Sequence, residues 1–226
     1  MSPMTQLILA CAAFLATHYI ASTPLRPVLV ARFGKAYLAL YSVLAAVTLG
    51  WMIWALYHAP FINLWYKVAL RPVPMVLMPF ALIYIVCGLT SPNPTLVGQG
   101  RLLKSDSPAR GILRITRHPL MWGFALWAAS HIVARGDGAA VIFFGTFLVL
   151  ALSGTWLIDR RKAATLGADW RRFAAVTSNI PFVAIAAGRN HLSIREIGVW
   201  KILLALALDA VLVALHHRLF GVHAMI

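Results

Sequence analysis

Long apolar stretches recur along this chain, and they constrain its fold more than any other feature. An α-helix needs roughly 20 apolar residues to cross a bilayer, and six stretches approach that length. They lie near 4–23, 36–57, 73–90, 118–134, 139–158 and 198–219. The chain is 61% hydrophobic and 12% charged, which is far more apolar than a soluble domain. We therefore expect an all-α fold: a polytopic membrane helical bundle of about six transmembrane helices, forming one domain over residues 1–226.

The basic residues are distributed unevenly between the connections. Most of the 20 Lys and Arg residues lie in 24–35, 91–117 and 159–197, which alternate with connections that are poor in positive charge. Cytoplasmic loops carry the excess of Lys and Arg, so we expect these three inside and both termini outside. A net charge of +14 suggests nucleic acid in a soluble protein, but here it lies between apolar spans. The expected partner is the lipid bilayer, with no nucleic acid.

Four histidines lie within or at the borders of the predicted spans: His18, His118, His131 and His216. Hydrocarbon does not solvate an imidazole, so each is a candidate functional residue. The alternative for a lone histidine is a structural hydrogen bond to a neighbouring helix. His131 is about 20 Å deeper than His118 at the helical rise. Depth alone therefore pairs His18 with His118, and His131 with His216.

The residues around these histidines favour one kind of ligand. Asp209 is the one clear acid within the spans, which argues against Mg²⁺ or Ca²⁺ because both prefer oxygen ligands. Zinc needs three or four close ligands, and no such cluster is evident. Haem needs one or two axial ligands in an apolar pocket. Trp127 is a candidate lining residue, and Arg26 and Arg117 stand at the cytoplasmic border, where they are candidates to pair with propionates.

A set of polar and aromatic positions spread over most of the chain gives it a family resemblance. The set consists of His18 with Ser22 and Leu25-Arg26, Gly34 with Tyr37 and Tyr41-Ser42, Arg117-His118-Pro119 with Trp122-Gly123, Trp127 and His131, Ile180-Pro181-Phe182, and His216 before Phe220-Gly221. In this pattern the chain resembles the NnrU family of bacterial inner-membrane proteins, which is related to zeta-carotene isomerase of plants and cyanobacteria. The resemblance implies a multi-pass protein of the bacterial inner membrane, and the orientation expected from the basic residues then makes both termini periplasmic.

The resemblance also implies a cofactor, haem b, ligated by two histidines that match His18 and His131. We prefer this pair to the pairing by depth, and His118 or His216 remains an alternative for one ligand. His118 otherwise orients the site. The isomerase branch has a cysteine three residues before the second ligand, where this chain has Ala128. Alanine supplies no thiolate, so the ligand switch of that branch is not expected here.

Several functions follow from this resemblance. The NnrU branch implies a redox-related role that supports nitrite and nitric oxide reduction in denitrification, with a respiratory nitrogen-oxide reductase system as partner. The alternative is a haem-dependent cis–trans isomerase similar to zeta-carotene isomerase. A non-catalytic assembly protein, with histidines that only form hydrogen bonds, is a further hypothesis.

A more remote similarity rests on the order of several residues along the chain: Arg117-His118-Pro119, followed by Asp159, Gly167, Trp170 and Pro181. This order is similar to that of isoprenylcysteine carboxyl methyltransferases and implies an S-adenosylmethionine-dependent methyltransferase. The usual acidic pair is here Ile158-Asp159, so one of the two carboxylates of that family is missing.

Overall fold

The computed structural model describes residues 1–65, 67–105, 107–222 and 224, and helices dominate this part of the chain. The helices are α1 (Pro3–Ile20), α2 (Leu25–Phe33), α3 (Ala36–His58), α4 (Val73–Thr90), α5 (Pro119–Arg135), α6 (Gly138–Val176), α7 (Val183–Ala186), α8 (Ile194–Ile197) and α9 (Val199–Phe220), with short 3₁₀ turns η1 (Val68–Leu70), η2 (Gly100–Lys104) and η3 (Gly111–Arg114). The expected all-α helical bundle is confirmed.

Within these described residues, five helical segments are long and apolar enough to cross a membrane: α1, α3, α4 together with η1, α6 and α9. The remaining predicted span, near 118–134, is α5, which has 17 residues. It rises about 25 Å, a little less than the roughly 30 Å of a hydrocarbon core. The helices therefore suit a multi-pass membrane protein, with α5 as the shortest of the six helices that match predicted spans.

The long helix α6 differs most from its predicted span. It has 39 residues and runs to Val176, well past the expected end near residue 158, with a break at Gly167, where φ is +52°. A positive φ favours glycine because it has no Cβ to clash, so Gly167 redirects the helix. The segment Val183–Ala186 forms only the four-residue α7, which is too short to cross a bilayer.

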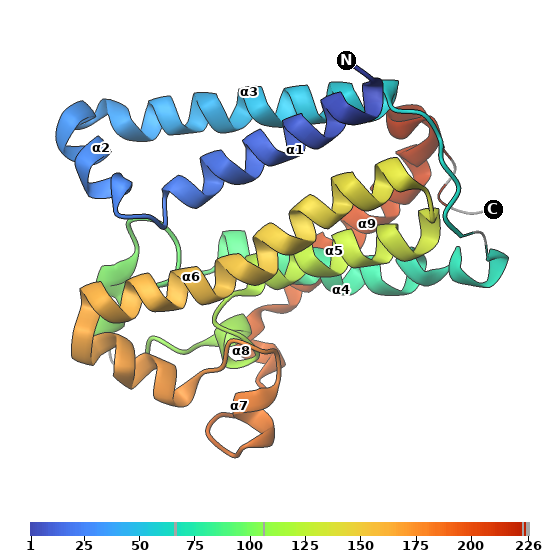
Figure 1. Cartoon of the computed structure of the whole chain (residues 1–226). Helices are drawn as coiled ribbons and strands as arrows, with labels where there is room; N and C mark the ends of the chain where they lie inside the picture. Colours follow the sequence, from blue (N-terminus) through green and yellow to red (C-terminus); the bar gives the residue numbers. More distant parts are fainter. Residues whose placement is uncertain (66, 106, 223, 225–226) are drawn as a thin grey trace.

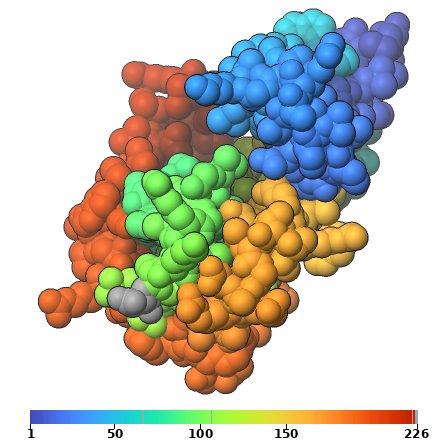
Figure 2. All heavy atoms as spheres, turned by 90° about the vertical axis from the view of Figure 1, so that its left-hand side faces the viewer, coloured from blue at the N-terminus to red at the C-terminus, as the bar shows by residue number. Residues whose placement is uncertain are grey.

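The helices pack as two antiparallel pairs joined by α6 (Figure 1). One pair is α1 with α3, and the other is α4 with α5; α6 contacts both α1 and α5, and α9 packs on α4. The start of α1 and the end of α9 lie at one end of the bundle, while α2, α7 and α8 lie toward the other (Figure 1). Figure 2 looks onto this second end, where the blue N-terminal segment lies against the orange of α6.

Two features of the packing position the functional side chains. An apolar core of residues from α1, α3, α5 and α6, including Phe14, Ala128 and Phe144, joins the two pairs. Within the second pair, α4 and α5 approach closely at Gly123, where an added Cβ would lie 2.8 Å from the Ala81 carbonyl oxygen. The close packing of α4 and α5 therefore fixes the position of α5, and His131 of α5 lies against that core.

Candidate functional site

His18 lies in the last turn of α1, at the edge of the apolar core. Its Nδ1 is 2.8 Å from the Phe14 carbonyl oxygen one turn earlier. A carbonyl only accepts hydrogen bonds, so Nδ1 carries the proton and donates it. The ring lies 4.1 Å from the Phe14 ring, centroid to centroid, and 6.0 Å from that of Tyr41 on α3. The other ring nitrogen, Nε2, keeps a free lone pair in the neutral imidazole.

His131 on α5 repeats this arrangement. Its Nδ1 donates to the Trp127 carbonyl oxygen at 2.8 Å, which again leaves Nε2 as the nitrogen with the lone pair. The imidazole stacks on Phe144 of α6, with centroids 4.9 Å apart, and meets the Trp127 ring at 5.7 Å. The two histidines therefore share one tautomer, although they come from helices of different pairs.

Aromatic rings connect the two histidines across the core. Phe14, beside His18, lies 5.3 Å from Phe147, and Phe147 lies 5.0 Å from Trp127, beside His131. Among the described residues, no hydrogen bond or ring contact joins His18 directly to His131. The structure thus places both imidazoles on one aromatic cluster, in which the rings of Phe14, Phe147 and Trp127 connect them.

The donor chemistry of this cluster fits haem better than a bare metal ion. In the part of the chain that the structure describes, no three His, Cys, Asp or Glu side chains converge in a way that could hold a metal. A haem iron takes its equatorial ligands from the porphyrin and needs only one or two axial ligands from protein. The two imidazoles, each with Nδ1 bonded to a carbonyl as is usual for metal-ligating histidines, are the residues of this cluster that could act as such ligands.

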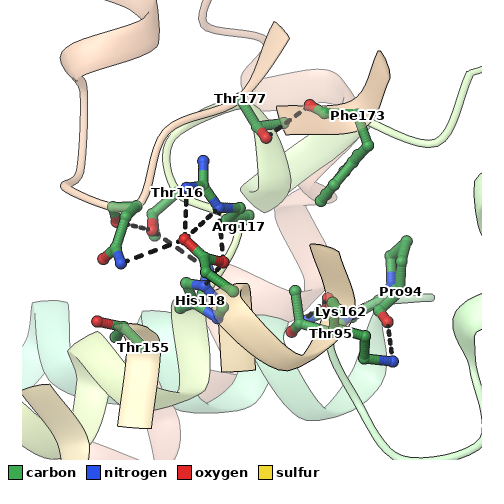
Figure 3. Close-up of polar contacts among 12 residues, drawn as sticks. Pro94, Thr95, Thr116, Arg117, His118, Thr155, Lys162, Phe173 and Thr177 are labelled. Carbon is green, nitrogen blue, oxygen red and sulfur yellow. Dashed lines mark hydrogen bonds and ion pairs between the residues drawn. The ribbon is translucent and has the colours of Figure 1, made fainter. Parts of the chain in front are cut away.

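His118 lies elsewhere, in a polar cluster at the loop-rich end of the bundle (Figure 3). Its Nε2 is 2.6 Å from Oδ1 of Asp159 on α6. Arg117 binds the same carboxylate through Nε, 2.9 Å from Oδ1 and 3.0 Å from Oδ2, and through Nη2. Asn179 approaches Oδ2 at 3.5 Å. The Asp159 carboxylate thus binds both the guanidinium of Arg117 and the imidazole of His118, from the segment before α5.

Backbone contacts fix the segment that carries Arg117 and His118. Pro119 occupies the first turn of α5, with His118 as its N-cap in a non-helical conformation (φ −121°, ψ 54°). The Arg117 amide donates to the Ser178 carbonyl at 3.0 Å, and the Trp122 indole donates to the Asn179 carbonyl at 2.8 Å. The loop after α6 therefore closes over the start of α5. Sequence reasoning did not single out Asn179; its signal is its place directly before Ile180-Pro181.

The polar cluster leaves one atom unused. His118 is only 2% exposed, and its Nδ1 is buried without a hydrogen-bond partner in the described structure. Arg117, in contrast, is committed to Asp159 through two of its nitrogens. A propionate role for Arg117 would therefore compete with a carboxylate that already binds it.

The other two predicted positions lie apart from this cluster. Arg26 stands on α2, near the end of α1 that carries His18. His216 on α9 donates from Nδ1 to the Val222 carbonyl at 2.8 Å and is close enough to His131 to interact with it electrostatically. The pair His18 and His131 is connected through the aromatic cluster, and the pairing of His131 with His216 stays a prediction.

Comparisons with known proteins agree with the resemblance seen in the sequence. A model of the NnrU protein family matches residues 6–224. Over 82 residues the chain is 40% identical to the chloroplastic 15-cis-zeta-carotene isomerase of Arabidopsis thaliana and 38% identical to that of Zea mays. Each match covers 36% of this chain and 22% of the plant protein, and no solved structure matches. Because the family model spans nearly the whole sequence, this chain belongs to the NnrU family.

Proposed function

We propose that this chain is a haem b membrane enzyme of the zeta-carotene isomerase kind, with His18 and His131 as the axial ligands. The observation that carries the proposal is their shared hydrogen-bonding state. Each Nδ1 is bonded to a carbonyl of its own helix, and each Nε2 keeps a lone pair beside the same aromatic cluster. The similarity to two plant isomerases supports the class of activity.

The protein residues have definite tasks in this proposal. The carbonyls of Phe14 and Trp127 fix the tautomer and orientation of the two imidazoles, as groups hydrogen-bonded to metal-ligating histidines commonly do. The rings of Phe147 and Trp127 exclude water and offer flat apolar surfaces. Haem, when bound, supplies a redox-active iron. A substrate that reaches this core through the bilayer must itself be apolar, and a long conjugated hydrocarbon fits that description.

Ala128 makes this chain different from an isomerase with a cysteine at that position. Its side chain is fully buried in the core and offers no ligand atom. We therefore expect the iron to keep two imidazoles in both oxidation states. A change to thiolate coordination on oxidation would contradict this expectation, and electron paramagnetic resonance distinguishes the two ligand sets.

The absorption spectrum tests the cofactor assignment. The protein is expressed with haem supplied and purified beside His18→Ala and His131→Ala. The matched control is His58→Ala, because His58 makes the same Nδ1 bond to Trp54, at 2.8 Å, but is exposed on α3. We expect a low-spin Soret band in wild type and in the control, and its loss or conversion to high spin in the other two. A wild-type protein without a Soret band would overturn the proposal.

Complementation tests the activity. The gene is expressed in a bacterial host engineered to accumulate 15-cis-zeta-carotene, and the carotene isomers are separated by chromatography. We expect isomerisation with wild type and with His58→Ala, and none with His131→Ala. A haem-loaded protein that leaves the isomer ratio unchanged would remove the isomerase activity from the proposal while retaining the cofactor.

Membership in the NnrU family favours a second candidate function: support of nitrite and nitric oxide reduction during denitrification, together with a respiratory nitrogen-oxide reductase system. Its test is a deletion strain that grows on nitrate without oxygen. Accumulation of nitrite or nitric oxide, corrected by wild type but not by His131→Ala, is the expected result. Normal nitrogen-oxide reduction in the deletion strain would contradict it.

The proposed location is the bacterial inner membrane, with both termini periplasmic. The basic connections at one end of the bundle and the position of the start of α1 and the end of α9 at the other end (Figure 1) support this orientation. Reporter fusions test it: alkaline phosphatase fused after residue 220 is expected to be active, and phosphatase fused near residue 105 inactive.

A further inference from the structure

A group of cationic and phenolic side chains lies beside His18, where α1 ends and α6 passes it. Arg161 of α6 donates from Nη1 to the carbonyl of Ala21, the C-cap of α1, at 2.9 Å. Its remaining donors have no hydrogen-bond partner in the described part of the chain. Asp159 lies only two positions earlier, but Arg117 and His118 already occupy its carboxylate. Arg161 is therefore a half-buried cation, and the acid two positions before it already has two partners.

Two tyrosines of α3 connect this arginine to His18. The Tyr41 ring lies 6.0 Å from the His18 ring, centroid to centroid. The Tyr37 ring stacks on the Tyr41 ring, with centroids 6.3 Å apart. The Tyr37 hydroxyl is buried and has no hydrogen-bond partner among the residues described. A buried hydroxyl without a partner is costly, so this atom indicates a ligand or water that completes the site.

Arg26 adds a second positive charge at the same place. It interacts electrostatically with Arg161, which also interacts with both tyrosines. No ion pair joins either arginine to an acid within the described ranges. Figure 2 shows the blue segment that contains residue 26 directly against α6. Two like charges near one another destabilise the protein unless an anion lies between them.

We propose that Arg26, Arg161 and the hydroxyls of Tyr37 and Tyr41 bind an oxyanion, a carboxylate or a phosphate, beside His18. Guanidinium groups bind both anions through strong charge-assisted hydrogen bonds, and phenolic hydroxyls add neutral donors. Two sources supply such a group at this membrane border: a propionate of the haem, in which case the inference rests on the proposed function, and the phosphate of an anionic lipid headgroup.

The first arm of the test compares haem with haem dimethyl ester, which has no free carboxylates. Each is titrated into detergent-solubilised apoprotein and followed by the Soret absorbance. If the site holds propionates, Arg161→Gln weakens haem binding roughly tenfold or more, as expected for a lost charge-assisted hydrogen bond, and leaves ester binding unchanged. The matched control is Arg160→Gln, because Arg160 lies over the Trp156 ring instead.

The second arm tests the lipid source. Wild type and variants are reconstituted in nanodiscs of phosphatidylglycerol and phosphatidylcholine, and retained lipid is counted by native mass spectrometry. If the site holds a lipid phosphate, wild type retains phosphatidylglycerol, Arg161→Gln loses it, and the haem titrations of the two proteins coincide. This arm remains decisive if no variant binds haem, so failure of the proposed function and failure of this inference are distinguishable.

A second variant separates ligand binding from the structural bond to Ala21. Tyr37→Phe keeps the ring stack and removes only the unpartnered hydroxyl, so folding is preserved. We expect it to weaken binding of the same oxyanion severalfold. The inference is overturned if Arg161→Gln and Tyr37→Phe match Arg160→Gln in both arms.

Discussion

The two halves of the molecule are held together by different forces. From α4 to the start of α9, side chains bind across loops: Arg117 and His118 to Asp159, and Lys162 to the Pro94 carbonyl at 2.8 Å. The hairpin of α1 and α3 instead lies on α6 mainly through apolar side chains. This contrast indicates that hydrogen bonds fix the half that contains His118 and His131. The hairpin that contains His18 is held mainly by apolar packing, which is less directional.

The contrast matters for the proposed cofactor site. Apolar packing is non-directional, so α1 is able to shift along α6 without breaking many hydrogen bonds. The aromatic rings between His18 and His131 must move for both imidazoles to reach one iron. If the proposed cofactor binds, we expect the movement in the half that is held by apolar contacts, and we expect the polar cluster around Asp159 to stay in place.

Removing the centre of the polar cluster is expected to have the largest effect. Asp159→Ala leaves Arg117 and His118 buried without their acceptor, and breaking a buried ion pair costs about 3–5 kcal/mol. Equilibrium unfolding in mixed micelles measures the change. The control is Asp169→Ala, whose pairing with Arg172 is exposed and worth at most about 0.5 kcal/mol. Equal losses of unfolding free energy in both variants would contradict the conclusion that the polar cluster holds this half of the molecule in place.

The next largest effect is expected at the close approach of α4 and α5. In Gly123→Ala, the new Cβ would lie 2.6 Å from Ile85 Cγ1 and 2.8 Å from the Ala81 carbonyl oxygen. Separating the helices costs about 1–3 kcal/mol. Gly145→Ala on α6 is the matched control, because no atom lies within 4 Å of its added Cβ and alanine favours the helix. If α4 and α5 form a rigid pair, Gly123→Ala should lower the free energy of unfolding and Gly145→Ala should raise it.

Acid is expected to loosen the fixed half first at α8. Two hydrogen bonds from Arg114, at 2.7 and 2.8 Å, and one from the Gly111 amide lower the pKa of Glu196 from 4.5 to about 2. A lowered pKa in the folded state gives stability that is complete above pH 4.5 and is lost as the pH falls toward 2. The melting temperature of wild type should therefore exceed that of Arg114→Gln at pH 6, and the difference should shrink below pH 4.5. A difference independent of pH, as expected for Arg195→Gln against wild type, would contradict this.

The sequence predicted the helices well because their signal is local. Apolar length sets the spans, and prolines such as Pro119 mark where they begin, so the boundaries of α4 and α9 lie within one residue of expectation. The end of α6 was not predictable in this way. Its charged residues after Ile158 favour loop by hydropathy, yet they are good helix formers, and the turn at Gly167 depends on its positive φ.

The candidate site was predictable residue by residue but not as an arrangement. Intramembrane position singles out His18 and His131 as unusual, whereas their common tautomer depends on carbonyls that periodicity does not reveal. Arg117 looked free for a propionate because its partner, Asp159, is 42 positions away. Arg161 lay unnoticed in a basic run, since only the three-dimensional fold shows that it reaches α1. Long-range polar pairs are the part that sequence reasoning misses.

The smallest expected effect is in the hairpin itself. The Tyr19 hydroxyl and the Ser153 hydroxyl are 2.7 Å apart, one of few polar links between α1 and α6. Such interhelical hydrogen bonds in membranes average about 0.6 kcal/mol, so Tyr19→Phe should barely change the unfolding free energy. It should nevertheless raise hydrogen exchange in α1 more than in α5, because the weakly held half loses one of its few directional contacts. Equal increases in both helices would show that the hairpin is locked to the rest, and the movement needed to join His18 and His131 would then lie elsewhere.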